Sequence, residues 1–424
     1  MEKTKTLFSL VLLLCSFVAD AKSIINKIVY KGNEVTREIV LNREIYISSG
    51  DKFDEALIEK SRQAIMDLGL FKSVTYYLEE NYQKGNAKNK NNLINVIFVI
   101  KEKYFILLIP RLKIEEDKVY YGLQFKGDNL WGLNHSMRLL AEDRGVTKGV
   151  DESRYSFKYF YPNINNSHYN LDFLVQTINT VDETDGLVDR QDDNYRTGLT
   201  RWLNKKGQSR GWFIGGNVAY QQRFNENLII QDNSQSINAT ILGMDIGYKN
   251  TNDFKYNRGG KSYGYNLNWS GESINSEAAF TKHLFYYQSY YRLKNDPVSN
   301  VNVQMKLGYA NDKILDEYAF RLGSSSDLRG YENNRFQGNT LFLSNIEYMF
   351  PKFNKPLIRY VTFIDIGNTY QQLSDVLHRP LNIGAGVGLR WKIRSLVKID
   401  LRADVAYGVS DEDYRFSFGT RHAF

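Results

Sequence analysis

Beyond residue 104 the chain consists of short stretches in which apolar and polar residues alternate, and this alternation is the period of a β-strand. The pattern is clearest over residues 398–407, where one face is charged and the other is apolar. The charged face holds Lys398, Asp400, Arg402 and Asp404, and the apolar face holds Ile399, Leu401, Ala403, Val405 and Tyr407. A two-faced strand of this kind fits a membrane barrel, whose outer side meets lipid and whose inner side meets a wet lumen.

We count sixteen such strands, or about 20 residues for each strand with its connection, which suits tilted barrel strands joined by turns and loops. They begin near Phe105, Lys118, Leu133, Ser153, His168, Tyr195, Arg210, Ile237, Lys261, Ala278, Val301, Gly338, Leu357, Leu381, Val397 and Tyr414. The predicted fold class of residues 104–424 is therefore an all-β transmembrane barrel of sixteen antiparallel strands.

Residues 22–103 predict a separate, small α+β domain with the order strand, helix, helix, strand, strand. Thr36 is the expected N-cap of the first helix and Asp54 that of the second, because both side chains can accept a hydrogen bond from a free backbone amide. Gly69 follows the second helix as its C′ residue. The expected strands cover residues 25–30, 71–78 and 93–99.

Residues 1–21 have the pattern of a secretory signal peptide. Lys3 and Lys5 form its charged start, residues 7–18 are apolar, and residues 19–21 form an A-x-A cleavage site. The only cysteine, Cys15, lies inside this segment. The expected mature chain therefore has no disulfide and no thiolate metal ligand.

The composition narrows the class of protein further. The mean hydropathy is -0.46 and no long apolar run follows the N-terminal segment, which excludes a membrane protein built of helices. The 30 Tyr and 24 Phe are enough to form aromatic girdles at both membrane interfaces of a barrel. The net charge of +7 is spread along the chain, so it indicates no nucleic-acid partner.

A long polar loop over residues 321–338 lies between the eleventh and twelfth expected strands. Taken alone, it would be a solvated surface loop. However, Glu347 and Asp365 fall on inward-facing positions of the next two strands, whose lipid-facing positions are apolar. A loop arginine that entered the lumen would need such carboxylates to offset its desolvation.

Leu328-Arg329-Gly330-Tyr331 resembles the arginine-glycine-aromatic motif in the sixth surface loop of the BamA/TamA-like outer-membrane assembly proteins, the bacterial surface-antigen superfamily. Residues 22–103 look like a single POTRA domain, whereas members of this family commonly carry several. Further stretches match the family in the same order: residues 345–348 with Pro351, 363–368, 384–390, 400–402 and the terminal Phe424.

The resemblance implies a Gram-negative outer-membrane protein with its POTRA domain in the periplasm, and a function without enzymatic chemistry. The implied function is insertion or translocation of other proteins: the POTRA edge receives an unfolded client by strand addition, and the seam between the first and last barrel strands releases it. The implied partners are unfolded outer-membrane or secreted clients, the lipid bilayer and periplasmic accessory proteins. Secretion of one dedicated partner, a structural barrel or passive pore, and lastly a lumenal hydrolase remain as alternatives.

The resemblance also places Arg329, with Gly330 and Tyr331, against Glu347 and Asp365. We call these five residues the loop lock. The alternative is that the two acids are ordinary lumenal charges that face water.

Two further groups of residues have expected roles, one in weakening the barrel seam and one in targeting the barrel to the outer membrane. Pro110 in the first strand lacks an N–H, and Gly419 in the last strand adds backbone freedom, so both would weaken the seam. The alternative is that Pro110 ends the linker and the strand starts at Arg111. Tyr414, Phe416, Phe418 and Phe424 share a face and resemble the C-terminal recognition signal of outer-membrane barrels; the alternative is that they are only lipid-facing aromatics.

Three patterns that imitate other sites carry no cofactor or metal in our interpretation. Residues 384–388 have the wrong spacing for a nucleotide-binding loop and are expected to be strand glycines. The acidic residues between 182 and 193 lack EF-hand spacing and are expected in a solvated loop. The five histidines show no metal-ligand spacing, and no G-x-S-x-G nucleophile motif is present, so we expect no catalytic, metal or cofactor site.

Overall fold

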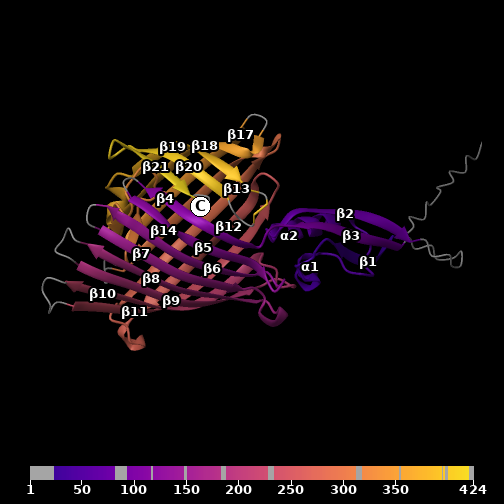
Figure 1. The fold of residues 1–424 in the computed structure, drawn as a ribbon, viewed down its shortest axis with the longest axis horizontal. Helices are drawn as coiled ribbons and strands as arrows, with labels where there is room; N and C mark the ends of the chain where they lie inside the picture. Colours follow the sequence, from indigo (N-terminus) through magenta and orange to yellow (C-terminus); the bar gives the residue numbers. More distant parts are fainter. Residues whose placement is uncertain are drawn as a thin grey trace, which may run out of the picture.

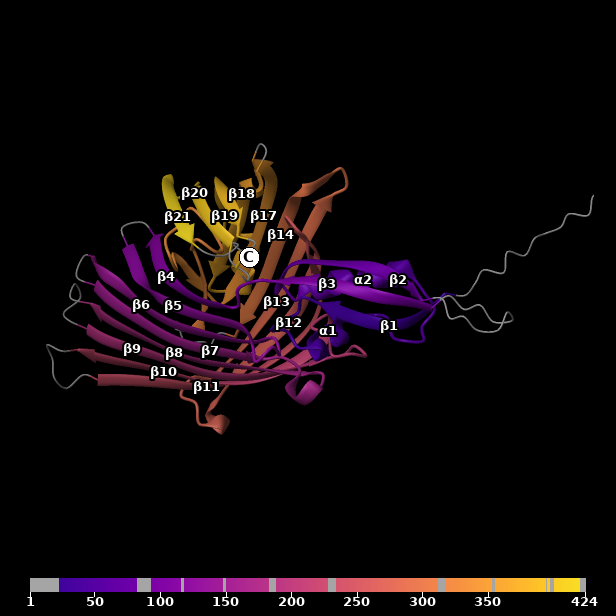
Figure 2. The same ribbon diagram turned by 45° about the vertical axis from the view of Figure 1, so that its right-hand side comes forward.

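The computed structural model describes residues 23–81, 93–115, 118–147, 150–182, 188–227, 234–311, 318–352, 355–393, 395–396 and 400–419. The chain forms a small N-terminal α+β domain and a large β-barrel, and the domain projects from one end of the barrel (Figures 1 and 2). No helix among these residues has the length and apolar character needed to cross a membrane. The expected signal peptide, residues 1–21, lies outside the described residues.

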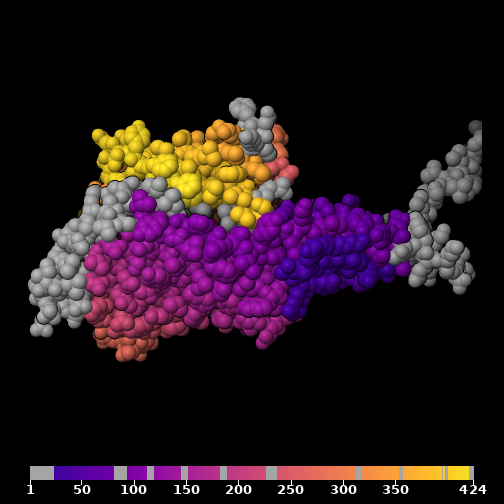
Figure 3. Space-filling model, viewed as in Figure 1, coloured from indigo at the N-terminus to yellow at the C-terminus, as the bar shows by residue number. Residues whose placement is uncertain are grey.

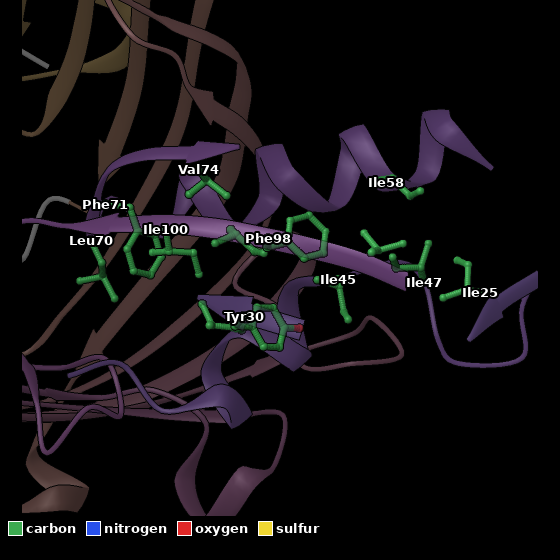
Figure 4. Packing of buried hydrophobic residues seen from close by; sticks show 13 residues of the cluster. Ile25, Tyr30, Ile45, Ile47, Ile58, Leu70, Phe71, Val74, Phe98 and Ile100 are labelled. Atoms are coloured by element: carbon green, nitrogen blue, oxygen red, sulfur yellow. The ribbon is translucent and has the colours of Figure 1, made fainter. Parts of the chain in front are cut away.

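The N-terminal domain has the predicted order of elements: β1 (Ile24–Lys31), α1 (Glu38–Glu44), α2 (Glu55–Asp67), β2 (Phe71–Asn81) and β3 (Leu93–Glu102). The sheet order is β1-β3-β2, with β3 parallel to β1 and antiparallel to β2. Its core gathers around the central strand β3, where Phe98 stacks on Tyr30 with ring centroids 5.9 Å apart (Figure 4). Phe98 also meets the Tyr76 ring edge-on.

The two helices of this domain begin in different ways. The Asp54 side chain accepts hydrogen bonds from the amides of Ala56 and Leu57 and so caps α2 as predicted. The prediction for α1 is wrong, because its N-cap is Arg37 and no side chain caps it. Thr36 is buried and its hydroxyl donates to Glu102 instead, while Asn129 of the barrel donates to the same hydroxyl. The Thr36 hydroxyl is therefore used in tertiary hydrogen bonds and does not cap the helix.

All sixteen predicted barrel strands are present, and each pairs antiparallel with its neighbours. They are β4 (Ile106–Glu115), β5 (Lys118–Leu130), β6 (His135–Thr147), β7 (Val150–Tyr161), β8 (Tyr169–Asp182), β9 (Val188–Trp202), β10 (Gly211–Asn227), β11 (Ser234–Asp253), β12 (Arg258–Ser270), β13 (Phe280–Leu293), β14 (Asp296–Ala310), β17 (Thr340–Lys352), β18 (Lys355–Tyr370), β19 (Asn382–Lys392), β20 (Asp400–Gly408) and β21 (Asp413–Gly419). Within the described residues, short 3₁₀ turns lie in the connections at Ile164–Asn166, Glu272–Ile274 and Leu373–Leu377.

The ring of strands closes where β21 meets β4. Among the described residues, one pair joins these two strands, Ser417 with Glu115. By contrast, seven pairs join β20 to β21 and ten join β4 to β5. In Figure 3 the yellow wall that contains β21 and the purple wall that contains β4 meet on the face turned to the viewer. This junction is the seam.

The strands have one apolar outer face and one polar inner face, as the alternation predicts. On β17, Ile346 is 47% exposed on the outside while the neighbouring Glu347 is fully buried inside. On β20, Val405 is exposed and Asp404 is buried in the same way. The inner face therefore collects the charged side chains from which a lumenal site can be built.

The N-terminal domain docks on four turns at one end of the barrel, which join β5–β6, β7–β8, β9–β10 and β11–β12. Arg37 donates its amide to Gly132 at 3.0 Å, and Arg43 donates to Asn163 at 2.6 Å. Gln208 and Lys206 donate to the carbonyls of Glu44 and Ile45 at 2.8 and 2.6 Å, and Asp67 pairs with Arg210. The turns lie at the end of the barrel opposite the β14–β17 loop, because successive hairpins alternate between the two ends.

The N-terminal domain should depend on Phe98 for its own stability. Phe98→Ala removes a buried ring from the core and should cost about 3–5 kcal/mol, whereas Leu78→Ala on the exposed side of β2 should cost much less. Thermal unfolding and limited proteolysis of the full chain would measure this. Equal losses in the two variants, or loss of the barrel along with the domain, would contradict the described packing.

Candidate functional site

The β14–β17 loop folds back into the barrel. It contains a small hairpin, β15 (Phe320–Leu322) and β16 (Phe336–Gly338), and Leu328 and Tyr331 in the segment that connects these two strands are buried. They join an apolar cluster with residues from several barrel walls: Ala219, Ala239, Ile241, Phe280, Leu341 and Leu343. The loop therefore occupies the lumen, and the alternative of a solvated surface loop does not hold.

Within the loop, the structure brings Arg329 against Glu347 of β17 and Asp365 of β18. Arg329 Nε and Nη2 donate to the two oxygens of Asp365 at 2.6 and 2.7 Å, and Nη1 donates to Glu347 Oε1 at 2.6 Å. The backbone amide of Arg329 also donates to Asp365 at 3.1 Å, and its guanidinium lies 3.5 Å from the ring centre of Phe363. Arg329 is only 2% exposed. Removing one partner from a buried pair of this kind typically costs about 3–5 kcal/mol.

The charged cluster extends toward the seam through two residues that the sequence interpretation did not assign. Arg390 of β19 donates to Glu347 Oε1 at 3.1 Å and to Asp404 Oδ1 of β20 at 2.5 Å. Together with Arg402, which lies 3.9 Å from Asp404, three arginines face three carboxylates. The inward positions of Asp404 and Arg402 are readable from the alternation, but their partners are set by the register between strands.

The tip of the loop rests on glycines of the barrel wall. A Cβ at Gly384 of β19 would lie 1.9 Å from the Arg329 carbonyl oxygen, and one at Gly408 of β20 would lie 2.3 Å from that of Gly330. Gly330 itself has φ +94, which favours glycine. The Tyr331 hydroxyl then donates to the Ile383 carbonyl at 2.8 Å. We call Gly384 and Gly408 the glycine seat. Gly384 is one of the expected strand glycines, and its lack of a side chain also lets the loop backbone approach the strand backbone.

The seam residues lie inside strands. β4 begins at Ile106, so Pro110 is paired within it, opposite Leu123 of β5, and the alternative start at Arg111 is wrong. Gly419 ends β21 opposite Arg402. The pair that joins the two sides, Ser417 with Glu115, lies at the far end of β4 from the N-terminal domain.

Where the structure describes them, the C-terminal aromatic residues and the acidic run lie on barrel strands. Tyr414, Phe416 and Phe418 of β21 are exposed on the outer face, and Phe424 lies outside the described residues. Much of the acidic run belongs to strands rather than to the expected loop, because Asp182 ends β8 and Asp189, Asp192 and Asp193 lie in β9. There Asp192 forms ion pairs with Arg190 at 3.2 Å and with Arg223 at 2.5 Å. These acids are therefore part of the barrel wall, and the expectation of a solvated loop is wrong for them.

Comparison with known proteins agrees with this architecture. Residues 129–424 match the Omp85 superfamily domain, and residues 23–103 match the POTRA family described as surface antigen variable number repeat. The outer membrane protein assembly factor BamA of Buchnera aphidicola subsp. Acyrthosiphon pisum is 26% identical over 151 residues, which are 35% of this chain. That match spans only 23% of the relative's own length.

Two solved structures show the same fold at low sequence identity. BamA from Haemophilus ducreyi lacking POTRA domains 1-3 has a TM-score of 0.57 and 14% identity, over 94% of this chain and 84% of that one. CdiB from Escherichia coli has a TM-score of 0.65 and 12% identity, over 94% and 76% of the two chains. The chain belongs to the Omp85 superfamily, as an outer-membrane β-barrel with one POTRA domain on its periplasmic side.

Proposed function

We propose that the protein passes unfolded client proteins into or across the outer membrane, and that it does so without enzymatic chemistry. Family membership supports assembly or secretion as the broad function. The observation that carries the proposal is the combination of a loop fastened inside the lumen and a seam at which, among the described residues, a single residue pair joins β4 to β21. Such a barrel can be held in one state by the loop and opened along the seam.

In this proposal the loop lock, together with Arg390, holds β17, β18, β19 and β20, the four strands that lead to the seam, in one arrangement. Arg329 bonds residues of β17 and β18, and Arg390 links β17 to β20, the strand next to β21. Movement of these strands would leave charges buried without partners, which is costly in a low dielectric. The lock therefore favours a single working conformation of this wall.

The seam is the proposed exit. Phe105 accepts a hydrogen bond from the Asp128 amide at 2.8 Å, which continues the register of β4 with β5. Residues of an antiparallel strand turn their backbone groups alternately to one neighbour and to the other. Five positions further on, the Pro110 nitrogen accordingly turns away from β5, toward the side where β21 lies. The missing donor supports our assignment of Pro110 to the seam.

The energy of seam opening is correspondingly small. Each backbone hydrogen bond contributes about 1 kcal/mol net in water, and more in lipid, where no water can replace it. Within the described residues, β4 and β21 share one pair and so contribute little of this stabilisation, in contrast to the ladders on either side. A client strand that added to β4 or β21 would supply the missing hydrogen bonds.

The POTRA domain is the proposed entrance. In the described part of the chain β2 pairs only with β3, so its outer edge is free to receive an extended client by strand addition. Tyr77 and Leu78 are exposed on this strand and offer apolar contact. Outer-membrane or secreted clients, lipid and periplasmic accessory proteins are the partners in this proposal.

The main alternative is secretion of one dedicated partner. A passive pore is less favoured by the structure, because the loop lies inside the lumen and joins residues of several walls. Depletion of the protein separates these functions: an assembly factor should cause loss of many barrels from the outer membrane, and a dedicated exporter should cause loss of one secreted protein. Steady conductance without any client defect would instead support the pore.

The lock predicts a defect that leaves the barrel folded. Arg329→Ala should keep a heat-modifiable barrel but impair client assembly, because a loss of about 3 kcal/mol lowers the locked population about a hundredfold. Glu347→Ala combined with Asp365→Ala should resemble it. Arg335→Ala is the matched control, since Arg335 is exposed and pairs only at the surface with Asp411. Full activity in Arg329→Ala would remove the lock from the mechanism.

The C-terminal aromatics predict a defect in the protein's own assembly. Deletion of Phe424 should reduce insertion of the barrel into the outer membrane and leave signal-peptide cleavage unchanged, as measured by fractionation and heat-modifiability. Tyr414→Leu is a control that keeps an apolar outer face. Normal insertion after deletion would mean that these residues serve only as lipid contacts.

The seam predicts that a covalent link blocks function reversibly. The Glu115→Cys/Ser417→Cys pair should form a disulfide that stops client assembly, and reduction should restore it. The control pair Val405→Cys/Phe416→Cys joins β20 to β21, which are already paired along their length. Activity that persists with the seam oxidised would contradict release through this junction.

A further inference from the structure

The β11–β12 turn, residues 254–257, lies between the POTRA domain and the opposite barrel wall. On the POTRA side, the amide of Asp253 donates to Asp67 Oδ1 at 2.7 Å, and Gln63 donates to the Asp253 carbonyl at 3.0 Å. Arg210 fixes the same Asp67 carboxylate from the β9–β10 turn. The C-terminal half of α2 is therefore bonded to Asp253, the residue that directly precedes this turn.

On its other side the turn reaches across the lumen. Lys392 of β19 donates to the Phe254 carbonyl at 3.1 Å. In the ring, β12 and β19 are separated by β13, β14, β17 and β18, so this contact spans the barrel and does not follow its wall. The Phe254 ring also lies 3.7 Å from the Arg292 guanidinium of β13.

Hydrogen bonds fix this turn to its neighbours, so that a displacement on one side of it would be passed to the other side. Asn257 is 2% exposed. Its side-chain nitrogen Nδ2 donates to the backbone carbonyls of Pro297, Val298 and Ser299 at 3.1, 3.3 and 3.2 Å. The Phe254 amide closes the turn by donating to the Asn257 carbonyl at 2.9 Å. A turn anchored at both ends and in its middle moves as a unit with its neighbours.

Lys392 connects this turn to the charged cluster of the lock. It lies two residues from Arg390 on β19, so both side chains point to the lumenal face. Arg390 bonds Glu347, which bonds Arg329. The acids Asp253 and Asp400 attract the Lys392 ammonium, the cations Arg258 and Arg359 repel it, and the Phe254 carbonyl accepts its hydrogen bond.

We infer that residues 254–257 form a strut that couples the position of the POTRA domain to the state of the loop lock. Displacement of α2 would pull Asp253 and Phe254 away from Lys392, and β19 would then lose a contact that keeps Arg390 in the cluster. Coupling between two sites is reciprocal, so release of the lock would in turn loosen the POTRA domain. This inference takes the proposed lock as its far end, but it concerns conformation and not client transfer.

The alternative is that the turn only stabilises the barrel locally. Two pairs of spin labels distinguish the two cases, because the only cysteine of the sequence, Cys15, lies in the expected signal peptide and not in the residues to be labelled. Lys27 with Leu377 reports the POTRA domain relative to the barrel, and Ser326 with Leu377 reports the loop. Lys27, Ser326 and Leu377 are exposed, so the labels should not disturb the core. Distances are measured in the full chain in lipid vesicles without any client.

Lys392→Met keeps the apolar stem and removes the donor, and it should increase the displaced population of both label pairs about fivefold or more. Lys255→Met is the control in the same turn, since Lys255 is exposed and its Nζ lies 4.9 Å from the ring centre of Tyr256; it should shift neither pair. Gln63→Leu tests the POTRA end without altering any barrel residue, and it should displace the loop as well. Arg329→Ala should loosen the POTRA pair.

The strut is wrong if Gln63→Leu or Lys392→Met moves the POTRA pair and leaves the loop pair unchanged, or if Lys255→Met has the same effect as Lys392→Met. A chain in which the labels respond as expected but client assembly is normal would retain the strut and reject the proposed function of the lock. Conversely, a defect in client assembly with uncoupled labels would retain the lock and reject the strut.

Discussion

The burial of one guanidinium constrains much of this structure. Arg329 can lie inside the barrel only because Asp365 and Glu347 present their oxygens at 2.6–2.7 Å from adjacent strands. That geometry requires the correct register of β17 with β18, a loop long enough to enter the lumen, and an apolar cluster that covers it. Since a buried charge without partners is so costly, the loop and the strands that hold it specify each other.

Local patterns predict the elements of this fold well, and long-range pairing defines its site. Alternation was enough to find all sixteen strands, and the cap of α2 followed from Asp54 alone, because each depends on neighbours within a few residues. Thr36 failed as a cap because Glu102 and Asn129, far away in sequence, compete for its hydroxyl. The meeting of Arg329 with its two acids was anticipated from a family motif, whereas the bonds of Arg390 depend on cross-strand register, which one sequence does not contain.

The barrel is uneven around its circumference. Long ladders join the strands from β8 to β11, of which β11 has 20 residues, while the described parts of β20 and β21 have nine and seven. The stabilising contacts on the short side come from inside the lumen: the charged cluster, the Tyr331 hydroxyl and the glycine seat all act on β17–β20. Side-chain and loop contacts thus take over there from the hydrogen-bond ladder, and they can be rearranged without breaking the long strands.

The glycine seat has a consequence for how the loop tolerates change. At Gly384 and Gly408 the loop contacts the wall through main-chain atoms, and glycine is already the smallest residue. The fit therefore cannot be adjusted by degrees: any side chain at either position expels the loop tip, and no substitution can draw it closer. Contact between the two backbones therefore behaves as an all-or-none property.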